Sequence, residues 1–182
     1  MVATWSTWLI NYITKDISTV TKGIIIHGCN AQGVMGSGVA KALRNKYPAI
    51  FNNYKAMCGV QGYNIDVMGQ VSYYNPTPRL LICNAITQEF YGKDGGRYAS
   101  VDAIDRAIQE VIIWTSELYI LDVCYTTVRD DSQYLDIFMP KIGCGLGGLS
   151  WDDEVLPVVQ RIDNNTSLKN MHYKIAFNIC DI

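Results

Sequence analysis

The chain has 182 residues and a formal net charge of −2, and 49% of its residues are hydrophobic. This length fits one domain, residues 1–182, and leaves little room for a second. The apolar content excludes a disordered chain, and the charge gives no sign of the large basic patch that a nucleic-acid binder needs. No apolar run is long enough to span a membrane, so we expect neither a nucleic-acid nor a membrane partner.

The first half of the chain predicts two strands followed by two helices. The N-terminal segment MVATWSTWLINYITKD lacks a basic region and soon meets charge, so it indicates a first strand and not a signal peptide. The run GIIIHG is short, β-branched and apolar on both faces, as is typical of a buried strand. From Gly36 the apolar residues fall at helical spacing, and Pro48 ends this helix. A second short helix follows, through Tyr54.

The second half continues the alternation. QVSYYN and RLLICNAI are predicted strands separated by the turn-forming NPTP. Ser100 is positioned to cap a long amphipathic helix, and DIFMP is a further strand. Ser150 and Asp153 have the spacing of a capping box before a helix that Pro157 should kink. YKIAFNI closes the chain as a strand. Strands that alternate with helices in this way predict a layered α/β domain.

The cysteines and histidines do not indicate a metal site. Six cysteines are scattered along the chain without a CxxC pair. His27 and His172 lie far apart and lack the spacing of zinc ligands. We therefore expect buried thiols in a reducing cytoplasm, with no metal and no cofactor.

Two glycine-rich segments follow predicted strands and precede predicted helices. They are HGCNAQGVMGSG, residues 27–38, and IGCGLGGL, residues 142–149. Their glycines let the backbone approach a ligand, and a helix start offers free N–H groups to phosphate. Because ligands of open α/β sheets bind beyond the carboxyl ends of strands, the pair favours a diphosphate held from two sides over two independent turns. Neither segment matches a nucleoside-triphosphatase loop or a dehydrogenase fingerprint.

The run IIIHGCNAQGVMGSGVAKAL together with MPKIGCGLGGLSW resembles the macrodomain family. Within that family the likeness is to the branch of ADP-ribose-1''-phosphate phosphatases and related ADP-ribosyl deacylases of yeast, animals, bacteria and phages. The stretch ITQEFYGKDGGRYAS also resembles a loop of microbial and phage members. The likeness extends from about Tyr12 to the last strand, and it implies a three-layer α/β/α fold with a central mixed sheet.

The resemblance also implies a set of ligand-binding residues. Asp16, with Ile17 beside it, occupies the place of an acid that binds the adenine amino group, and a surface turn residue is the alternative. Asn30 matches an asparagine that contacts the distal ribose, and Phe177 or Asn178 is implied to flank the adenine. The two diphosphate loops are matched by Gly36, Ser37, Gly38 and Val39, and by Gly143, Cys144, Gly145, Leu146 and Gly147.

His27 ends the second predicted strand, directly before the first glycine-rich segment. A yeast member of the family has a similar IHxCN pattern, and the resemblance implies catalytic roles for His27 and Asn30. An imidazole with a pKa near neutral can activate water or accept a proton in phosphoester cleavage. The alternative is a buried histidine that bonds to the backbone at the end of a strand.

The chain also departs from its relatives. Deacylating members use a lysine after the fourth strand and an aspartate after GCGL. Here Gln88 lies near the lysine position and Gly147 occupies the aspartate position, so that mechanism does not carry over. Lys93 and Arg97 are candidates to meet a terminal phosphate, and an exposed charged loop is the alternative.

Three functions are compatible with this resemblance. The first, which we expect, is slow hydrolysis of ADP-ribose-1''-phosphate to ADP-ribose and phosphate. The second is removal of ADP-ribose or an acyl group from an ADP-ribosyl ester. The third is a non-catalytic reader of ADP-ribose, because fold alone does not decide the chemistry. We expect a monomer that binds ADP-ribose or ADP-ribose-1''-phosphate in the cytoplasm, which is the host cytoplasm if a phage encodes the chain.

Overall fold

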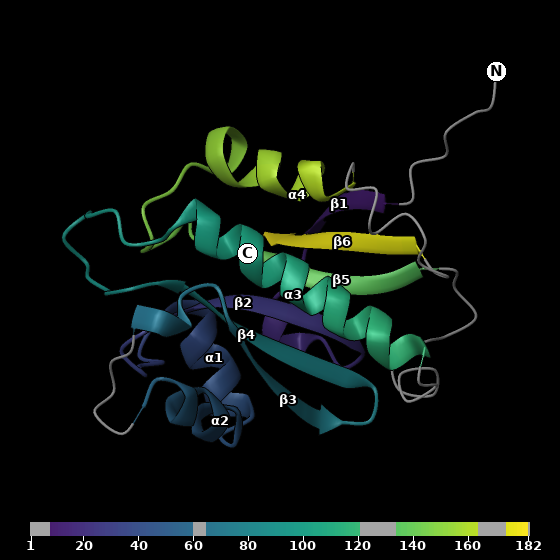
Figure 1. Cartoon of the computed structure of the whole chain (residues 1–182), viewed down its shortest axis with the longest axis horizontal. Coiled ribbons are helices and arrows are strands. Elements are labelled where there is room, and N and C mark those ends of the chain that lie inside the picture. Colours follow the sequence, from purple (N-terminus) through teal and green to yellow (C-terminus); the bar gives the residue numbers. More distant parts are fainter. Residues whose placement is uncertain (1–7, 60–64, 121–133, 164–173, 182) are drawn as a thin grey trace.

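The computed structural model describes residues 8–59, 65–120, 134–163 and 174–181, in which strands and helices alternate (Figure 1). The described strands are β1 (Trp8–Thr14), β2 (Gly23–Asn30), β3 (Val71–Thr77), β4 (Leu80–Gln88), β5 (Tyr134–Pro140) and β6 (Lys174–Asp181). The described α-helices are α1 (Gly38–Lys46), α2 (Ile50–Met57), α3 (Val101–Ile120) and α4 (Leu156–Asp163). Each falls where the sequence predicts it. His172 and one of the six cysteines, Cys124, lie outside the described ranges.

The described strands form one mixed sheet in the order β1-β6-β5-β2-β4-β3. Strands β1, β6, β5, β2 and β4 run parallel to one another, and β3 is antiparallel to β4. Strand β3 extends through Asn75, Pro76 and Thr77, so the chain reverses at Pro78 and Arg79, later than the predicted NPTP turn. A connection this short between β3 and β4 can only reverse the chain direction. The mixed sheet predicted for an α/β fold is confirmed.

Helices cover both faces of this sheet. Helices α3 and α4 pack on one face with Ile24 and Ile26 of β2, whereas α1 and α2 pack on the other face with Ile25. Successive strand residues point to opposite faces, which explains why Ile24, Ile25 and Ile26 of β2 are all apolar and buried. Figure 1 shows α3 crossing one face of the strands, with α1 and α2 beyond the sheet. The three-layer arrangement predicted from the sequence is present.

The described residues include neither a cluster of possible metal ligands nor a helix able to span a bilayer. No three histidine, cysteine, aspartate or glutamate side chains among them gather closely enough to hold a metal ion. None of their helices combines the length and apolarity needed to cross a bilayer. All the described cysteines are free thiols.

The start of α4 differs in detail from the predicted capping box. The Ser150 hydroxyl accepts a bond of 3.3 Å from the Asp153 amide, as predicted. The carboxylate that accepts from the Ser150 amide, at 2.9 Å, belongs to Glu154, one residue further along. The reason is that the first turn, Trp151–Val155, is a wide π-helical turn. The α-helix follows this wide turn directly at Leu156, and Pro157 is its second residue.

The loop that follows β5 packs against the segment that precedes α3. The Gly147 carbonyl accepts hydrogen bonds from the amides of Tyr98 and Ala99, both at 2.9 Å. A Cβ atom at Gly147 would lie 2.5 Å from the Gly143 carbonyl oxygen and 2.8 Å from the Ala99 Cβ. A Cβ atom at Gly145 would meet nothing within 4 Å. The loop therefore has no room for a side chain at one glycine and ample room at the other.

This contrast predicts unequal effects of the same substitution. Gly147→Ala should lower the free energy of unfolding by about 1–3 kcal/mol, because the backbone must shift to relieve the overlap. Gly145→Ala should change it by less than about 0.5 kcal/mol. Urea unfolding of both variants checks this, and equal stability of the two would contradict the packing described for Gly147.

Candidate functional site

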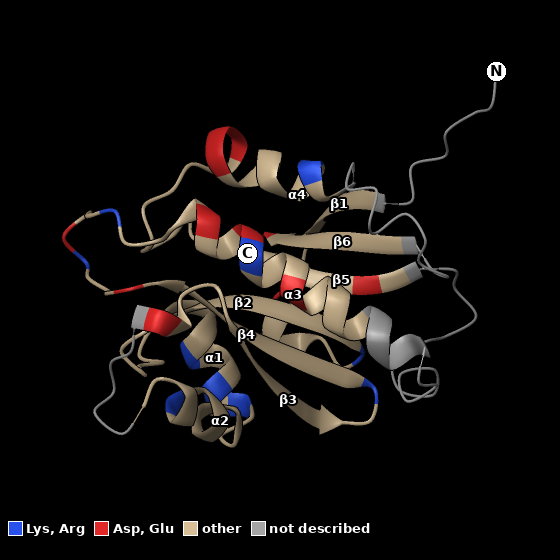
Figure 2. Ribbon diagram, viewed as in Figure 1, with Lys and Arg blue, Asp and Glu red and all other residues tan. Residues whose placement is uncertain are grey.

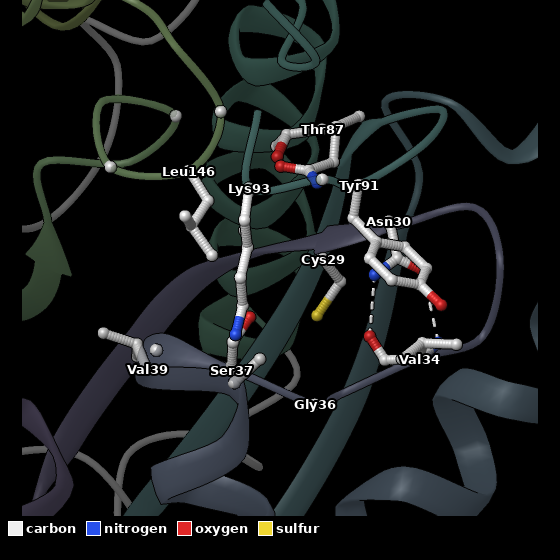
Figure 3. A pocket seen from close by; sticks show the side chains of 18 of the residues that line it. Cys29, Asn30, Val34, Gly36, Ser37, Val39, Thr87, Tyr91, Lys93 and Leu146 are labelled. Atoms are coloured by element: carbon white, nitrogen blue, oxygen red, sulfur yellow. Dashed lines mark hydrogen bonds between the residues drawn. The ribbon is translucent and has the colours of Figure 1, made fainter. Parts of the chain in front are cut away.

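A pocket of about 540 Å³ lies at the edge of the sheet where the parallel strands end (Figure 3). Its walls come from the loops that follow β2, β4 and β5. All three strands run in the same direction, so their carboxyl ends meet at this edge. The structure thus brings the two glycine-rich segments of the sequence to one pocket.

The first glycine-rich loop lines the pocket with Gly36, Ser37, Gly38 and Val39. Ser37 is the N-cap residue of α1, and its side chain makes no capping hydrogen bond. The first amides of an α-helix have no partner within the helix, and the helix dipole places partial positive charge beside them. This side of the pocket therefore offers backbone N–H donors to an anion.

Asn30 lines the pocket at the end of β2, and its amide is already engaged. Its Oδ1 accepts from the amides of Gln32 at 3.0 Å and Val34 at 3.2 Å, and its Nδ2 donates to the Val34 carbonyl at 2.7 Å. Figure 3 shows the side chain turned toward Val34 across this short turn. An amide nitrogen carries two N–H donors, so one of them is left for a ligand.

Tyr54 is a residue that sequence analysis missed. It lies on α2, is fully buried, and places its hydroxyl 2.5 Å from the Asn30 carbonyl oxygen. The same hydroxyl accepts from the Val34 amide at 2.9 Å. Its position within a predicted helix gave no signal that the hydroxyl turns toward the end of β2.

The second glycine-rich loop lines the pocket with Gly143, Gly145, Leu146 and Gly147. Cys144 belongs to the same loop but is not part of the lining. Its thiol lies 3.4 Å from the Ile142 carbonyl oxygen, and burial raises its pKa to about 11. A thiol held in the neutral form is a poor nucleophile, so this loop offers its backbone rather than its cysteine.

The segment between β4 and α3 adds a third wall. Tyr91, Gly92 and Lys93 line the pocket. The segment is braced from within, because Asp94 accepts from the Tyr98 hydroxyl at 2.6 Å. Figure 3 shows the Lys93 side chain extending into the pocket between Leu146 and Tyr91.

The lining of the pocket is positively charged. Among its described residues it has two lysines, Lys93 and Lys141, and no aspartate or glutamate. Lys141 pairs with Asp181 at 2.9 Å, whereas no carboxylate in the described part of the chain lies within ion-pair distance of Lys93. Arg97 points elsewhere and pairs with Glu154 at 2.6 Å. The structure thus separates the two cations that the sequence grouped together.

Basic residues also dominate the helices beside the pocket. Helices α1 and α2 carry four basic residues and no acidic one, as the blue segments of Figure 2 show. Since α1 begins in the lining of the pocket, this distribution favours an anionic ligand over a cationic one.

His27 does not line the pocket. It is fully buried, and its Nε2 lies 2.7 Å from Asn84 Oδ1 on the neighbouring strand β4. Burial lowers its pKa to about 4, so the imidazole is neutral at physiological pH. Its Nδ1 faces the thiol of Cys29 at 3.8 Å, and Cys29 does line the pocket. The Cys29 side chain therefore lies between the His27 imidazole and the pocket.

The residues assigned to the adenine are also outside the pocket lining. Asp16 is exposed at the end of β1, where it accepts from the Ser18 amide at 2.8 Å, and this bond lowers its pKa. Ile17 beside it is buried. Phe177 is buried in the middle of β6, within the apolar layer beneath α3 and α4. Asn178 bonds to Asn11 and Asp136 at 3.0 Å each.

Comparison with known proteins gives relatives that cover most of the chain. An ADP-ribose 1''-phosphate phosphatase of Candida albicans is 26% identical over 167 residues, which is 86% of this chain and 95% of the relative. The macrodomain of Thermus aquaticus DarG superposes with a TM-score of 0.66 at 20% identity, covering 96% of this chain and 99% of that one.

A second solved structure has the same fold with its ligand bound. Thermosipho africanus DarTG in complex with ADP-ribose superposes with a TM-score of 0.61 at 16% identity, covering 94% of this chain and 41% of that one. At these identities the two structures support the fold alone. The model of the macro domain family matches residues 26–156, which is well over half of the chain. This chain, which places two glycine-rich loops at one edge of its sheet, therefore belongs to the macro domain family.

Proposed function

We propose that the pocket binds ADP-ribose with its diphosphate between the two glycine-rich loops, and that the protein hydrolyses ADP-ribose 1''-phosphate to ADP-ribose and phosphate. The observation that carries this proposal is the meeting of both loops on one pocket with a positive lining. Backbone amides at the start of α1 suit a diphosphate, and the relatives that cover most of the chain are named for this phosphatase activity.

The binding mode follows from the order of the loops along the sheet edge. The loops after β2 and β5 take the diphosphate, and Asn30 donates its free N–H to the distal ribose. Asp16, Ile17 and Phe177 remain predictions for the adenine end of the ligand.

Positioning and charge are the main sources of rate in this proposal. Water attacks the phosphorus and the bond between phosphorus and the 1''-oxygen breaks. One proton of the water ends on that oxygen, which leaves as the hydroxyl of ADP-ribose, and the water oxygen stays on the phosphate. Lys93 extends into the pocket and stabilises the charge on the phosphoryl oxygens. Fixing the substrate in a rigid pocket removes the entropy cost of bringing the groups together.

His27 fits this scheme less well than Asn30 does. A group that transfers a proton must lie within hydrogen-bond reach of the reacting atoms, and His27 is covered by Cys29 and held by Asn84. Its catalytic role stays a prediction, and its position favours a structural bond between β2 and β4.

The two other functions differ in what they require. Removal of an ADP-ribosyl group by a lysine and an aspartate has no support at the matching positions. The Gln88 side chain is bonded to the Phe90 carbonyl, and Gly147 has no room for a side chain. A reader would bind ADP-ribose in the same pocket and release no phosphate.

A charge placed in the second loop tests the proposal. Gly145→Glu should fold, because a Cβ atom there meets nothing within 4 Å. Its carboxylate should weaken ADP-ribose binding by at least about a hundredfold through repulsion of the diphosphate. Calorimetry with ADP-ribose and phosphate release from ADP-ribose 1''-phosphate measure the two effects.

Gly145→Gln serves as the control, since it has the same bulk without the charge and should retain more affinity. Unchanged affinity in Gly145→Glu would remove the second loop from the site. Binding of ADP-ribose by the wild type without phosphate release would instead identify a reader.

The charge of Lys93 gives a second prediction. Lys93→Gln should weaken binding of ADP-ribose by about fivefold, the order expected for one solvent-screened ion pair. Lys55→Gln makes the same change of net charge on α2, outside the pocket lining, and should lower affinity much less than Lys93→Gln does. Titrations at low and high salt complete the test, because the difference between wild type and Lys93→Gln should shrink as salt rises. Equal losses in both variants would show that only net charge matters.

The buried imidazole gives a prediction for stability against pH. The pKa of His27 is about 4 in the folded protein and about 6.5 when unfolded, so the unfolded chain takes up the proton first. Stability should fall as pH drops from about 6.5 to 4, and His27 accounts for about 3 kcal/mol of that fall. His27→Gln should lose this part of the pH dependence, as urea unfolding across the range can measure. Phosphate release that survives in His27→Gln would exclude a catalytic imidazole.

A further inference from the structure

The turn that follows β2 is held by side-chain bonds rather than by a regular backbone ladder. Asn30 bonds to both the amide and the carbonyl of Val34, which lines the pocket. The turn is also tied to the end of β4, because the Ala31 amide donates to the Gln88 carbonyl at 2.8 Å. The Gln32 side chain donates to the Glu89 carbonyl at 3.3 Å. This turn therefore sets the geometry of two walls of the pocket.

The Tyr54 hydroxyl supports this turn from behind. It donates to the Asn30 carbonyl at 2.5 Å, accepts from the Val34 amide at 2.9 Å and lies 2.9 Å from Asn30 Oδ1. Tyr54 is fully buried and absent from the pocket lining, so it does not contact a ligand itself. Burial also raises the pKa of its hydroxyl, which keeps both its donor and its acceptor functions available.

We propose that Tyr54 is a positioning residue for ligand binding, which fixes the amide of Asn30 and the path of the first glycine-rich loop. Without the hydroxyl, the Asn30 carbonyl loses its close oxygen donor, and the Val34 amide keeps only its longer bond to Asn30 Oδ1. The loop then samples other conformations before a ligand binds, and the cost of ordering it appears as lost affinity. This inference rests on the proposed function, since it concerns the same pocket.

The test is Tyr54→Phe, which removes one oxygen and keeps the buried ring. The dissociation constant for ADP-ribose should rise by about tenfold, as expected for one hydrogen bond that preorganises the site. The KM for ADP-ribose 1''-phosphate should rise with it while kcat changes less, because the hydroxyl does not reach the reacting atoms.

Tyr73→Phe is the matched control. The Tyr73 hydroxyl lies 3.1 Å from the Glu110 carboxylate, and neither residue lines the pocket. Both variants should lose stability, and only Tyr54→Phe should lose affinity. Equal affinity in Tyr54→Phe and wild type would overturn the inference, and so would an equal loss in both variants.

Failure of the proposed function and failure of the variant to fold can each be told apart from failure of this inference. If the wild type does not bind ADP-ribose, the proposed function fails before Tyr54 is tested. If Tyr54→Phe does not fold, hydrogen exchange of the wild type decides the matter. The Val34 amide should exchange slowly, because a buried hydroxyl accepts its bond, and exchange at the rate of a free loop amide would overturn the inference.

Discussion

Five neighbouring strands of the described sheet run in one direction, and the site depends on this constraint. Parallel strands end at the same edge, so the loops that leave β2, β4 and β5 all begin there. The loops after β2, β4 and β5 therefore share one pocket although they are far apart in sequence. Their backbone amides can converge on one anion without any long side chain.

Glycine-rich loops have few side chains with which to hold their own shape, and the structure supplies this support from behind the pocket. The Gly147 carbonyl is held by two amides of the segment before α3. The first loop depends on Asn30, which in turn depends on the buried hydroxyl of Tyr54. Asn30 itself lines the pocket, whereas Tyr54, which supports it, lies outside the lining.

The charges of the pocket limit the chemistry available to it. The described lining has two lysines and no acid, although the whole chain has a formal net charge of −2. Such a pocket suits an anionic ligand such as a diphosphate, and its described lining has no carboxylate to act as a general base. Gln88 and Gly147 stand where deacylating relatives are implied to have a lysine and an aspartate, and His27 lies one residue behind the lining. Slow hydrolysis driven by positioning and charge is consistent with this set of groups.

The sequence alone was enough to predict the class of fold, the order of its elements and the two loops of the site. Those features depend on local signals: the apolar runs of the strands, the helical spacing after Gly36 and the turn-forming NPTP. The Ser150 cap was predicted as well, although the wide first turn moved its carboxylate partner to Glu154.

Only the tertiary structure decided how individual side chains are used. It buried His27 against Asn84, directed Lys93 into the pocket and Arg97 toward Glu154, and brought the Tyr54 hydroxyl to Asn30. A pattern along the chain shows which face of an element a residue occupies. It does not show which atoms of a distant segment lie opposite, because those contacts are set by the packing of elements that are remote in sequence.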